Sequence, residues 1–169
     1  IESGTTTLYH YDESGRMTRV ESPPGTVIQE SFHDAMSRRI RKTASDETTY
    51  FLYGEEGLRA EYDPAGNLKR QYLFTPGSFY GTEPLAMKQV GGRWSYYQTD
   101  HLGTPKYLTN QSGGSRWGAD YSLYGEVTVI PGAAVQNPLR FPGQYEDTET
   151  GLHQNWWREY DADLGGFGV

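Results

Sequence analysis

An all-β fold built from successive antiparallel hairpins is predicted by three features of the sequence. The chain holds 14 Tyr, 6 Phe and 4 Trp among 169 residues, and aromatic side chains favour strands and bury roughly 150–250 Å² each. Its 21 Gly and 9 Pro break most stretches with helical spacing, so long helices are not expected. A degenerate repeat, in which a strand leads into an Asp-to-Gly turn, recurs along the chain.

The clearest copy of the repeat lies at residues 9–20. Tyr9 and Tyr11 fall on one face of a strand, Asp12 and Gly15 bracket a tight turn, and the following residues return as a second strand. Asp opens such a turn because its carboxylate accepts hydrogen bonds from backbone N–H groups just ahead. Gly closes it because that position often needs a positive φ. This spacing predicts a β-hairpin.

Three further copies follow, each with an Asp that opens the turn. Ser37 takes the Gly position in the first of them. The turn residues of these copies are Asp34, then Asp63 with Gly66, then Asp100 with Gly103. Their spacing drifts, which indicates hairpins joined by loops of variable length. Short aromatic runs between the copies predict further strands at 50–54, 70–74, 93–97 and 120–125. The segment 151–160 suits a short helix or a strand equally well.

Composition argues against several classes of function. The net charge is −7 and the basic residues are dispersed, apart from 38–42, so nucleic-acid binding is not expected. Neither an 18-residue apolar run nor a basic region followed by an apolar run is present, which argues against a membrane span and a secretory signal. The absence of Cys removes disulfides, thiolate catalysis and Cys-ligated zinc. The four His lack the spacing of a helical metal site, so no metal and no cofactor are expected.

These residues resemble the tyrosine–aspartate (YD) repeats of the RHS family across nearly the whole chain. Residues 11–17, YDESGRM, look like the family repeat, and residues 97–105 are similar to a phrase near the end of bacterial RHS cores. The most specific stretch is NPLRFPGQYED at 137–147, followed by ETGLH, which resembles the RHS core terminus. The resemblance therefore divides the chain into a YD-repeat hairpin region, 1–136, and a core-terminal region, 137–169.

The resemblance implies a long sheet of hairpins that curves into a hollow shell, or β-cocoon, around a C-terminal toxin polypeptide. Such shells occur in bacterial RHS effectors of type VI secretion and in the C subunits of insecticidal toxin complexes, and teneurins carry a related barrel. The expected partners are the remainder of the shell and the enclosed toxin. The expected location is cytoplasmic before export and then secreted or cell-surface delivered. Because the chain begins at Ile1 and a shell needs more repeats, we expect a non-enzymatic segment from the last part of a longer polypeptide.

The resemblance also implies an aspartyl autoprotease at the end of the RHS core, which cuts the toxin loose. Arg158, Glu159 and Asp161 match its first element imperfectly, because Ala162 replaces a Pro and Gly166 replaces an Arg. The sequence ends before a second Asp and a scissile bond appear. One carboxylate of a pair cannot divide acid and base roles alone. We therefore expect these residues to be vestigial, with Arg158 ion-paired to one of the two carboxylates.

A carbohydrate-binding module is the alternative from another class of function. Exposed aromatic rings can stack on sugars through their apolar faces, and glycans would then be partners. The candidate rings are Trp94, Trp117, Trp156 and Trp157. Packing between sheet layers or along a shell wall is favoured over sugar stacking, because Trp is on average a highly buried residue.

Overall fold

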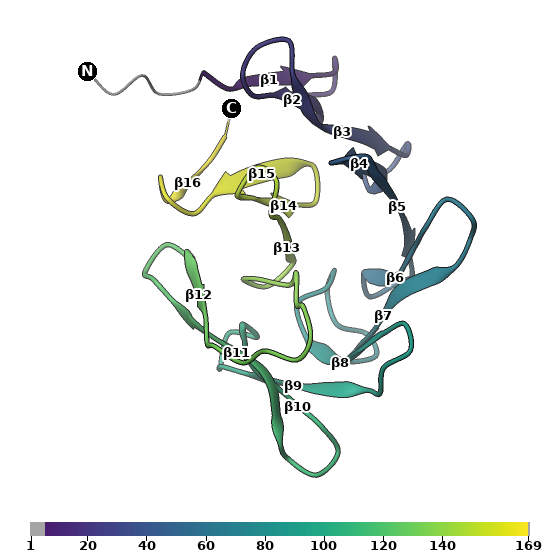
Figure 1. The fold of residues 1–169 in the computed structure, drawn as a ribbon, viewed down its shortest axis with the longest axis vertical. Helices are drawn as coiled ribbons and strands as arrows, with labels where there is room; N and C mark the ends of the chain where they lie inside the picture. Colours follow the sequence, from purple (N-terminus) through teal and green to yellow (C-terminus); the bar gives the residue numbers. More distant parts are fainter. Residues whose placement is uncertain (1–5, 169) are drawn as a thin grey trace.

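The computed structural model describes residues 6–168, and every helix or strand in that range is a β-strand (Figure 1). Twelve strands form one sheet in chain order, each antiparallel to its neighbours. They are β1 (Leu8–Tyr11), β2 (Met17–Glu21), β3 (Val27–His33), β4 (Arg39–Ala44), β5 (Glu47–Tyr53), β6 (Leu58–Tyr62), β7 (Leu68–Phe74), β8 (Pro84–Gln89), β9 (Ser95–Thr99), β10 (Pro105–Thr109), β11 (Ser115–Tyr121) and β12 (Val127–Val129). This curved sheet confirms the predicted all-β fold of consecutive hairpins.

A second antiparallel sheet of four strands, which we call the inner sheet, follows at the C-terminal end. Its strands are β13 (Gln144–Asp147), β14 (Leu152–Asn155), β15 (Arg158–Asp161) and β16 (Gly166–Phe167). The segment 151–160, which suited helix or strand, therefore forms most of the β14–β15 hairpin. Within residues 6–168 no helix is long and apolar enough to cross a membrane.

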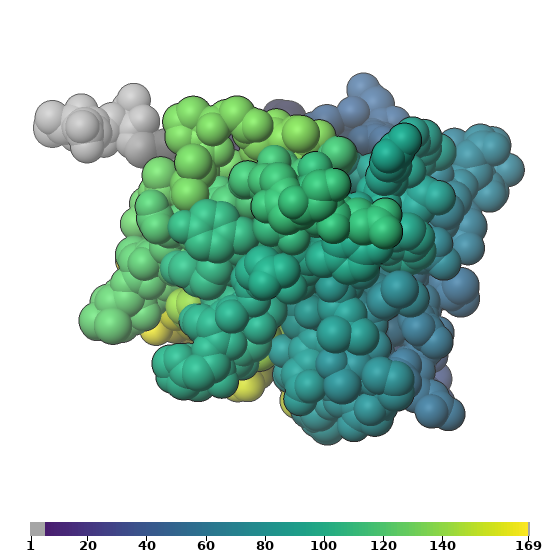
Figure 2. All heavy atoms as spheres, turned by 90° about the horizontal axis from the view of Figure 1, so that it is seen from below, coloured from purple at the N-terminus to yellow at the C-terminus, as the bar shows by residue number. Residues whose placement is uncertain are grey.

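The large sheet bends around the inner sheet (Figure 1). Strands β1 to β12 follow an open curve, and β13 to β15 lie inside it. Viewed from below, the curved sheet covers most of the C-terminal sheet, which is coloured yellow (Figure 2). The two sheets are thus two layers, one wrapped around the other.

Alternating side chains explain how one face of each strand reaches the core. In β5, Thr49 and Phe51 are buried while Tyr50 and Leu52 are exposed, the period of two that a sheet with one covered face requires. The main core combines aromatic and aliphatic side chains from the curved sheet with two from the segment that leads into β13. Its buried members are Phe51, Leu58, Tyr72, Phe74, Met87, Tyr97, Leu108, Trp117, Ala119, Val135 and Leu139.

Candidate functional site

The Asp of each repeat caps the turn that it opens. The Asp12 Oδ1 atom accepts hydrogen bonds from the backbone N–H groups of Ser14 and Arg16, at 2.9 and 3.0 Å. The Arg16 side chain also donates to this carboxylate, and these bonds lower the pKa of Asp12. Gly15 follows with a φ of 73°. The same pair of backbone N–H bonds is made by Asp34, Asp63 and Asp100. Ser37, in the Gly position of its repeat, also has a positive φ, 62°.

Two of the turn glycines should differ in how badly they tolerate Val. A Cβ at Gly15 meets no atom within 4 Å, so Gly15→Val costs only the left-handed backbone, about 1–2 kcal/mol of unfolding free energy. A Cβ at Gly103 collides with the Thr82 carbonyl oxygen as well, so Gly103→Val should cost more. His101→Ala in the same exposed turn is the control and should leave the unfolding free energy nearly unchanged. Urea unfolding measures all three, and equal losses would contradict this account of the turns.

A buried ion-pair cluster joins the inner sheet to the curved sheet. Arg39 of β4 and Asp147 of β13 are both 0 % exposed, and the two guanidinium Nη atoms donate to the two carboxylate oxygens. The Lys42 Nζ atom lies 2.9 Å from Asp147 Oδ1 and 2.7 Å from Glu149 Oε1. Gln29 of β3 donates a further hydrogen bond to Asp147 at 3.1 Å. Asp147 is therefore held from two strands of the curved sheet.

The charges of this cluster support one another. Burial alone would raise the pKa of Asp147, but the charges of Arg39 and Lys42 outweigh it and lower this pKa to about 2. Burial would likewise lower the pKa of Arg39, and the Asp147 carboxylate raises it instead. Both partners are consequently ionised at neutral pH, as a bidentate Arg–carboxylate pair requires.

Glu159 is a second buried carboxyl group at this interface. It is 4 % exposed and lies in register with Tyr145 and Gln154. Residues in register across a sheet share a face, and here that face packs on the curved sheet. Burial and, second, the negative charge of Asp147 raise the pKa of Glu159 to about 7.

The ion pair expected for Arg158 is not formed among residues 6–168. Its guanidinium carbon lies instead 3.9 Å from the centroid of the Phe167 ring, and the side chain is exposed. The reason is strand geometry, because Glu159 and Asp161 lie one and three residues further along β15 and therefore project from the opposite face. Asp161 caps the next turn, where its Oδ1 accepts from the N–H groups of Asp163 and Leu164. The three candidate protease residues are thus not brought together.

A second polar cluster ties the inner sheet to β6 and β7. Glu61 is fully buried, and its carboxylate accepts from Arg70 at 2.7 Å and from the Tyr72 hydroxyl at 2.5 Å. The Tyr145 hydroxyl of β13 donates to the same carboxylate at 3.2 Å. Burial raises the pKa of Tyr72 and of Tyr145 well above the ordinary tyrosine value. Both hydroxyls therefore stay protonated and can only donate to Glu61.

A cavity of about 920 Å³ opens beside these two clusters. It is lined by residues of β4 to β8, by Trp117 of β11 and Val129 of β12, and by the segment from Ala133 to Glu149. Its cationic side chains have carboxylate partners, Lys69 with Glu47 and Arg70 with Glu61, each at 2.7 Å. The charges of the cavity wall are therefore largely neutralised in pairs.

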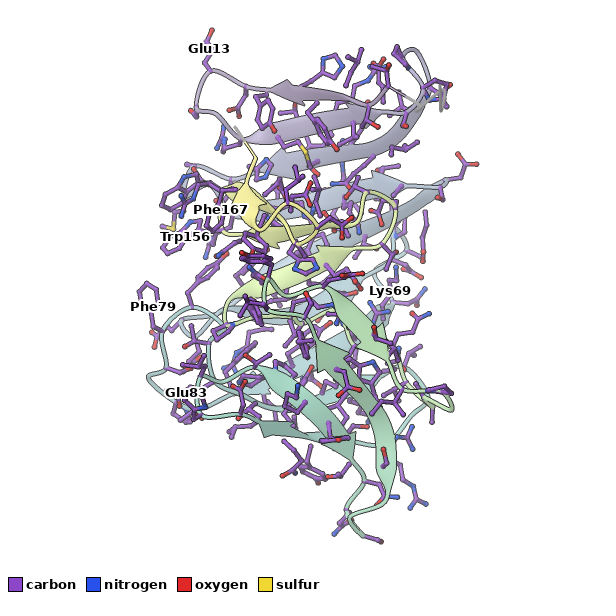
Figure 3. All side chains as sticks on the ribbon, turned by 90° about the vertical axis from the view of Figure 1, so that its left-hand side faces the viewer. Glu13, Lys69, Phe79, Glu83, Trp156 and Phe167 are labelled. Carbon is purple, nitrogen blue, oxygen red and sulfur yellow. The ribbon has the colours of Figure 1, made fainter. Side chains whose placement is uncertain are left out.

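The four Trp candidates for sugar stacking lie in different environments. Trp117 is 2 % exposed and belongs to the core, and Trp94 is half-buried. Trp156 has a φ of 62° and stacks on Tyr80 with ring centroids 4.4 Å apart. Figure 3 shows it on the same side of the molecule as Phe79. Of the four, the structure brings together only Trp156 and the more exposed Trp157, whose ring centroids are 5.2 Å apart.

Two histidines are neutral because of their surroundings. Burial, followed by the charge of Arg39 for His33 and of Arg140 for His153, lowers each pKa to about 4. Among residues 6–168 no group of three or more His, Cys, Asp or Glu side chains could hold a metal ion.

These histidines predict acid sensitivity. An unfolded histidine titrates near 6.5, above the folded value of about 4, so the unfolded chain takes up protons first as the pH falls. The free energy of unfolding should therefore decrease between pH 6.5 and pH 4. His153→Asn, which keeps a donor for Gln144, should make that decrease shallower in thermal melts. An unchanged slope would show that His153 is not responsible.

The residues of both charged clusters were not predicted from the sequence. Arg39 and Lys42 stand in the one basic run that the chain contains, and Asp147 ends the NPLRFPGQYED stretch. Inward-facing charged residues on a strand are a usable signal, because such residues are buried only when they are paired. Their partners could not be identified from local patterns, since Arg39 and Asp147 are 108 residues apart.

Comparison with known proteins gives a consistent picture. The family described as "RHS protein" matches residues 95–130. The double-stranded DNA deaminase toxin A of Burkholderia cenocepacia is 31 % identical over 96 % of this chain and 13 % of its own length. The toxin protein Tse5 of Pseudomonas aeruginosa is 30 % identical over 93 % of this chain and 12 % of its own. The chain thus spans about an eighth of the length of these relatives.

Solved structures of similar shape come from toxin complexes. The Tc holotoxin pore of Photorhabdus luminescens, with the mutation TccC3-D651A, aligns with a TM-score of 0.68 at 14 % identity. It covers 95 % of this chain, which corresponds to 8 % of the chain that it matches. The crystal structure of TcdB2-TccC3-Cdc42 aligns equally well, with a TM-score of 0.68 at 15 % identity over 95 % of this chain and 9 % of its own. These likenesses establish the fold.

Proposed function

The chain belongs to the RHS family, and we propose that it is a wall segment of a shell that encloses a toxin polypeptide. The observation that carries this proposal is the curvature of the twelve-stranded sheet around the inner sheet (Figure 1). A sheet that bends in one direction over so many strands has a concave side, and here that side holds part of the same chain. In this proposal the described part of the region 1–136, residues 6–136, forms the wall, and the described part of the region 137–169, residues 137–168, lies on its inner side.

The open ends of the curved sheet fit a wall that continues beyond this chain. Among the described residues β1 pairs only with β2, and β12 only with β11. All four residues of β1 are exposed, and three of them are Leu8, Tyr9 and Tyr11. Exposed edge strands with large side chains readily pair with further strands. We propose that neighbouring repeats of a longer RHS protein cover these edges.

The concave surface also suits a container. A wall that holds a guest polypeptide without one fixed pose should carry few unpaired charges. The cavity of about 920 Å³ has this character, because its Lys and Arg side chains pair with carboxylates of the same chain. The proposed role is therefore structural, and the deaminase activity in the name of the Burkholderia cenocepacia relative would reside outside this segment. Export by a type VI or related machine belongs to the same proposal.

Protease protection tests the enclosure. The polypeptide that contains residues 1–169 and its downstream domain is digested with a broad-specificity protease, and the fragments are identified by mass spectrometry. The downstream domain should survive in the intact polypeptide and should be degraded when it is expressed alone under matched conditions. Equal degradation of the domain in both samples would contradict enclosure.

An aspartyl autoprotease remnant is the second candidate, and the state of Glu159 favours it. A buried carboxyl group with a pKa near 7 can hold a proton at neutral pH, as one member of a catalytic carboxyl pair must. In a polypeptide extended downstream, cleavage near the core terminus should occur and should be abolished by Glu159→Gln. An uncut extended polypeptide would remove this candidate. Glycan binding has less support, because Trp117 lies in the core and one face of Trp156 is covered by Tyr80.

A further inference from the structure

The face of the inner sheet that packs on the curved sheet carries two buried carboxyl groups. Asp147 of β13 is fully buried, and Glu159 of β15 is 4 % exposed. Glu159 shares a register row with Tyr145, which is two residues before Asp147 on the same face. Both carboxyl groups therefore face the contact between the sheets, where water is excluded.

The groups around Glu159 leave it without a cation of its own. The charged groups that act on it are Asp147 on β13 and Arg39 and Lys42 on β4. The Tyr11 hydroxyl of β1 is also nearby, because burial and then the charge of Glu159 raise the pKa of Tyr11. Both Nη atoms of Arg39 bind Asp147, and Lys42 bridges Asp147 to Glu149. The cluster thus holds two cations and three carboxyl groups. Among the described residues, Glu159 Oε2 is buried without a hydrogen-bond partner.

Ionising Glu159 in this position is unfavourable for two reasons. A carboxylate that leaves water without a paired cation loses solvation that nothing in the protein replaces. Its charge also repels the Asp147 carboxylate, which stays ionised because Arg39 and Lys42 hold it. When the inner sheet separates from the curved sheet, Glu159 regains water and both penalties disappear.

We propose that Glu159 makes the packing of the inner sheet on the curved sheet depend on pH. The two sheets stay packed while its carboxyl group is protonated, and they separate more readily once it is ionised. The device needs no second molecule, because the titrating group and the surface that it acts on belong to the same chain. It is independent of whether the chain encloses a toxin.

The direction of the effect follows from the two states. Glu159 has a pKa of about 7 while the two sheets are packed together. When the sheets separate, its pKa returns to the ordinary value of 4.5. The packing of the two sheets therefore weakens as the pH rises from 4.5 to 7 and stays weak above that, by up to about 300-fold in the opening equilibrium. His33 and His153 act in the opposite direction, since their charging destabilises the fold below pH 6.5. Comparison of two variants at one pH cancels the contribution of the histidines.

Hydrogen exchange measured by mass spectrometry tests this device on the 169-residue chain. Exchange in the peptides that cover β13 to β15 is compared between the wild type and Glu159→Gln, at pH 5 and at pH 8. At pH 8 exchange in the Gln variant should be slower, by up to about 300-fold. At pH 5 the exchange rates of the two proteins should differ by no more than about 4-fold. Peptides from β9 and β10, which lie far along the sheet, serve as the internal reference.

Two further variants serve as controls for this test. Glu159→Asp retains a titratable group and should retain the pH dependence, although its shorter side chain alters the packing. Glu126→Gln changes an exposed carboxyl group and should leave exchange in β13 to β15 unchanged at both pH values. Faster exchange of Glu159→Gln at pH 8, or a wild-type-to-variant ratio that is the same at pH 5 and pH 8, would overturn the proposal.

Discussion

Replacing Asp147 by Ala should loosen the inner sheet from the curved sheet and lower the free energy of unfolding by about 3–5 kcal/mol. The substitution leaves Arg39, which is 0 % exposed, with a buried charge and no carboxylate partner. It also removes one of the acceptors of Lys42 and one of those of Gln29, so three side chains of β3 and β4 lose a contact together. This is the largest effect that we expect from a single charged residue in the chain.

Urea unfolding monitored by circular dichroism measures this loss. Asp163→Ala, in an exposed turn of the inner sheet, is the matched control and should change the unfolding free energy by less than about 0.5 kcal/mol. Replacing Arg39 and Asp147 together, as Arg39→Met with Asp147→Leu, should restore much of the loss because no unpaired charge remains. A loss below about 1 kcal/mol for Asp147→Ala would show that the buried pair does not hold the two sheets together.

Replacing Trp117 by Ala should have the second largest effect, a loss of about 3–5 kcal/mol. Trp117 is 2 % exposed on β11, and its ring packs in the main core with the Arg140 guanidinium 6.0 Å from the ring centroid. The surrounding strands are fixed by backbone hydrogen bonds to their neighbours and can collapse only partly into the space that is left. The variant should therefore retain a cavity, and its thermal midpoint should fall.

The comparison with Trp157 makes this prediction specific. Trp157 is 45 % exposed at the turn between β14 and β15, so Trp157→Ala should cost far less than Trp117→Ala. Melting temperatures of the two variants measure this difference in cost. Similar losses would mean that the core is not arranged around Trp117 as described.

The order of the hairpins could be predicted from the sequence because its signals are local. Asp12 and Gly15 lie three residues apart, and the bonds that cap their turn join residues no more than four apart. The aromatic runs at 50–54, 70–74 and 93–97 similarly predicted strands, since alternation within one strand is visible without knowledge of its partners. The strand predicted at 120–125 was wrong, because β11 ends at Tyr121 and 122–125 form a turn. Each hairpin pairs with the next, so a chain of local predictions assembles into the twelve-stranded sheet.

The contact between the two sheets could not be predicted in this way. It depends on Arg39 meeting Asp147 and on Gln29 meeting the same carboxylate, over 108 and 118 residues of chain. The prediction of an ion pair for Arg158 was wrong for a related reason. Adjacent charges in a sequence suggest a pair, but an extended strand sends them to opposite faces. The division of the chain at residue 137 remains a proposal.

Electron cryo-microscopy of the intact RHS polypeptide that contains this chain tests the central claim most directly. We expect a hollow shell in which residues 8–129 form part of the wall and residues 144–167 lie on its inner side, with Arg39 against Asp147. A map in which the curved sheet encloses no space, or in which residues 144–167 lie on the outer surface, would contradict the account.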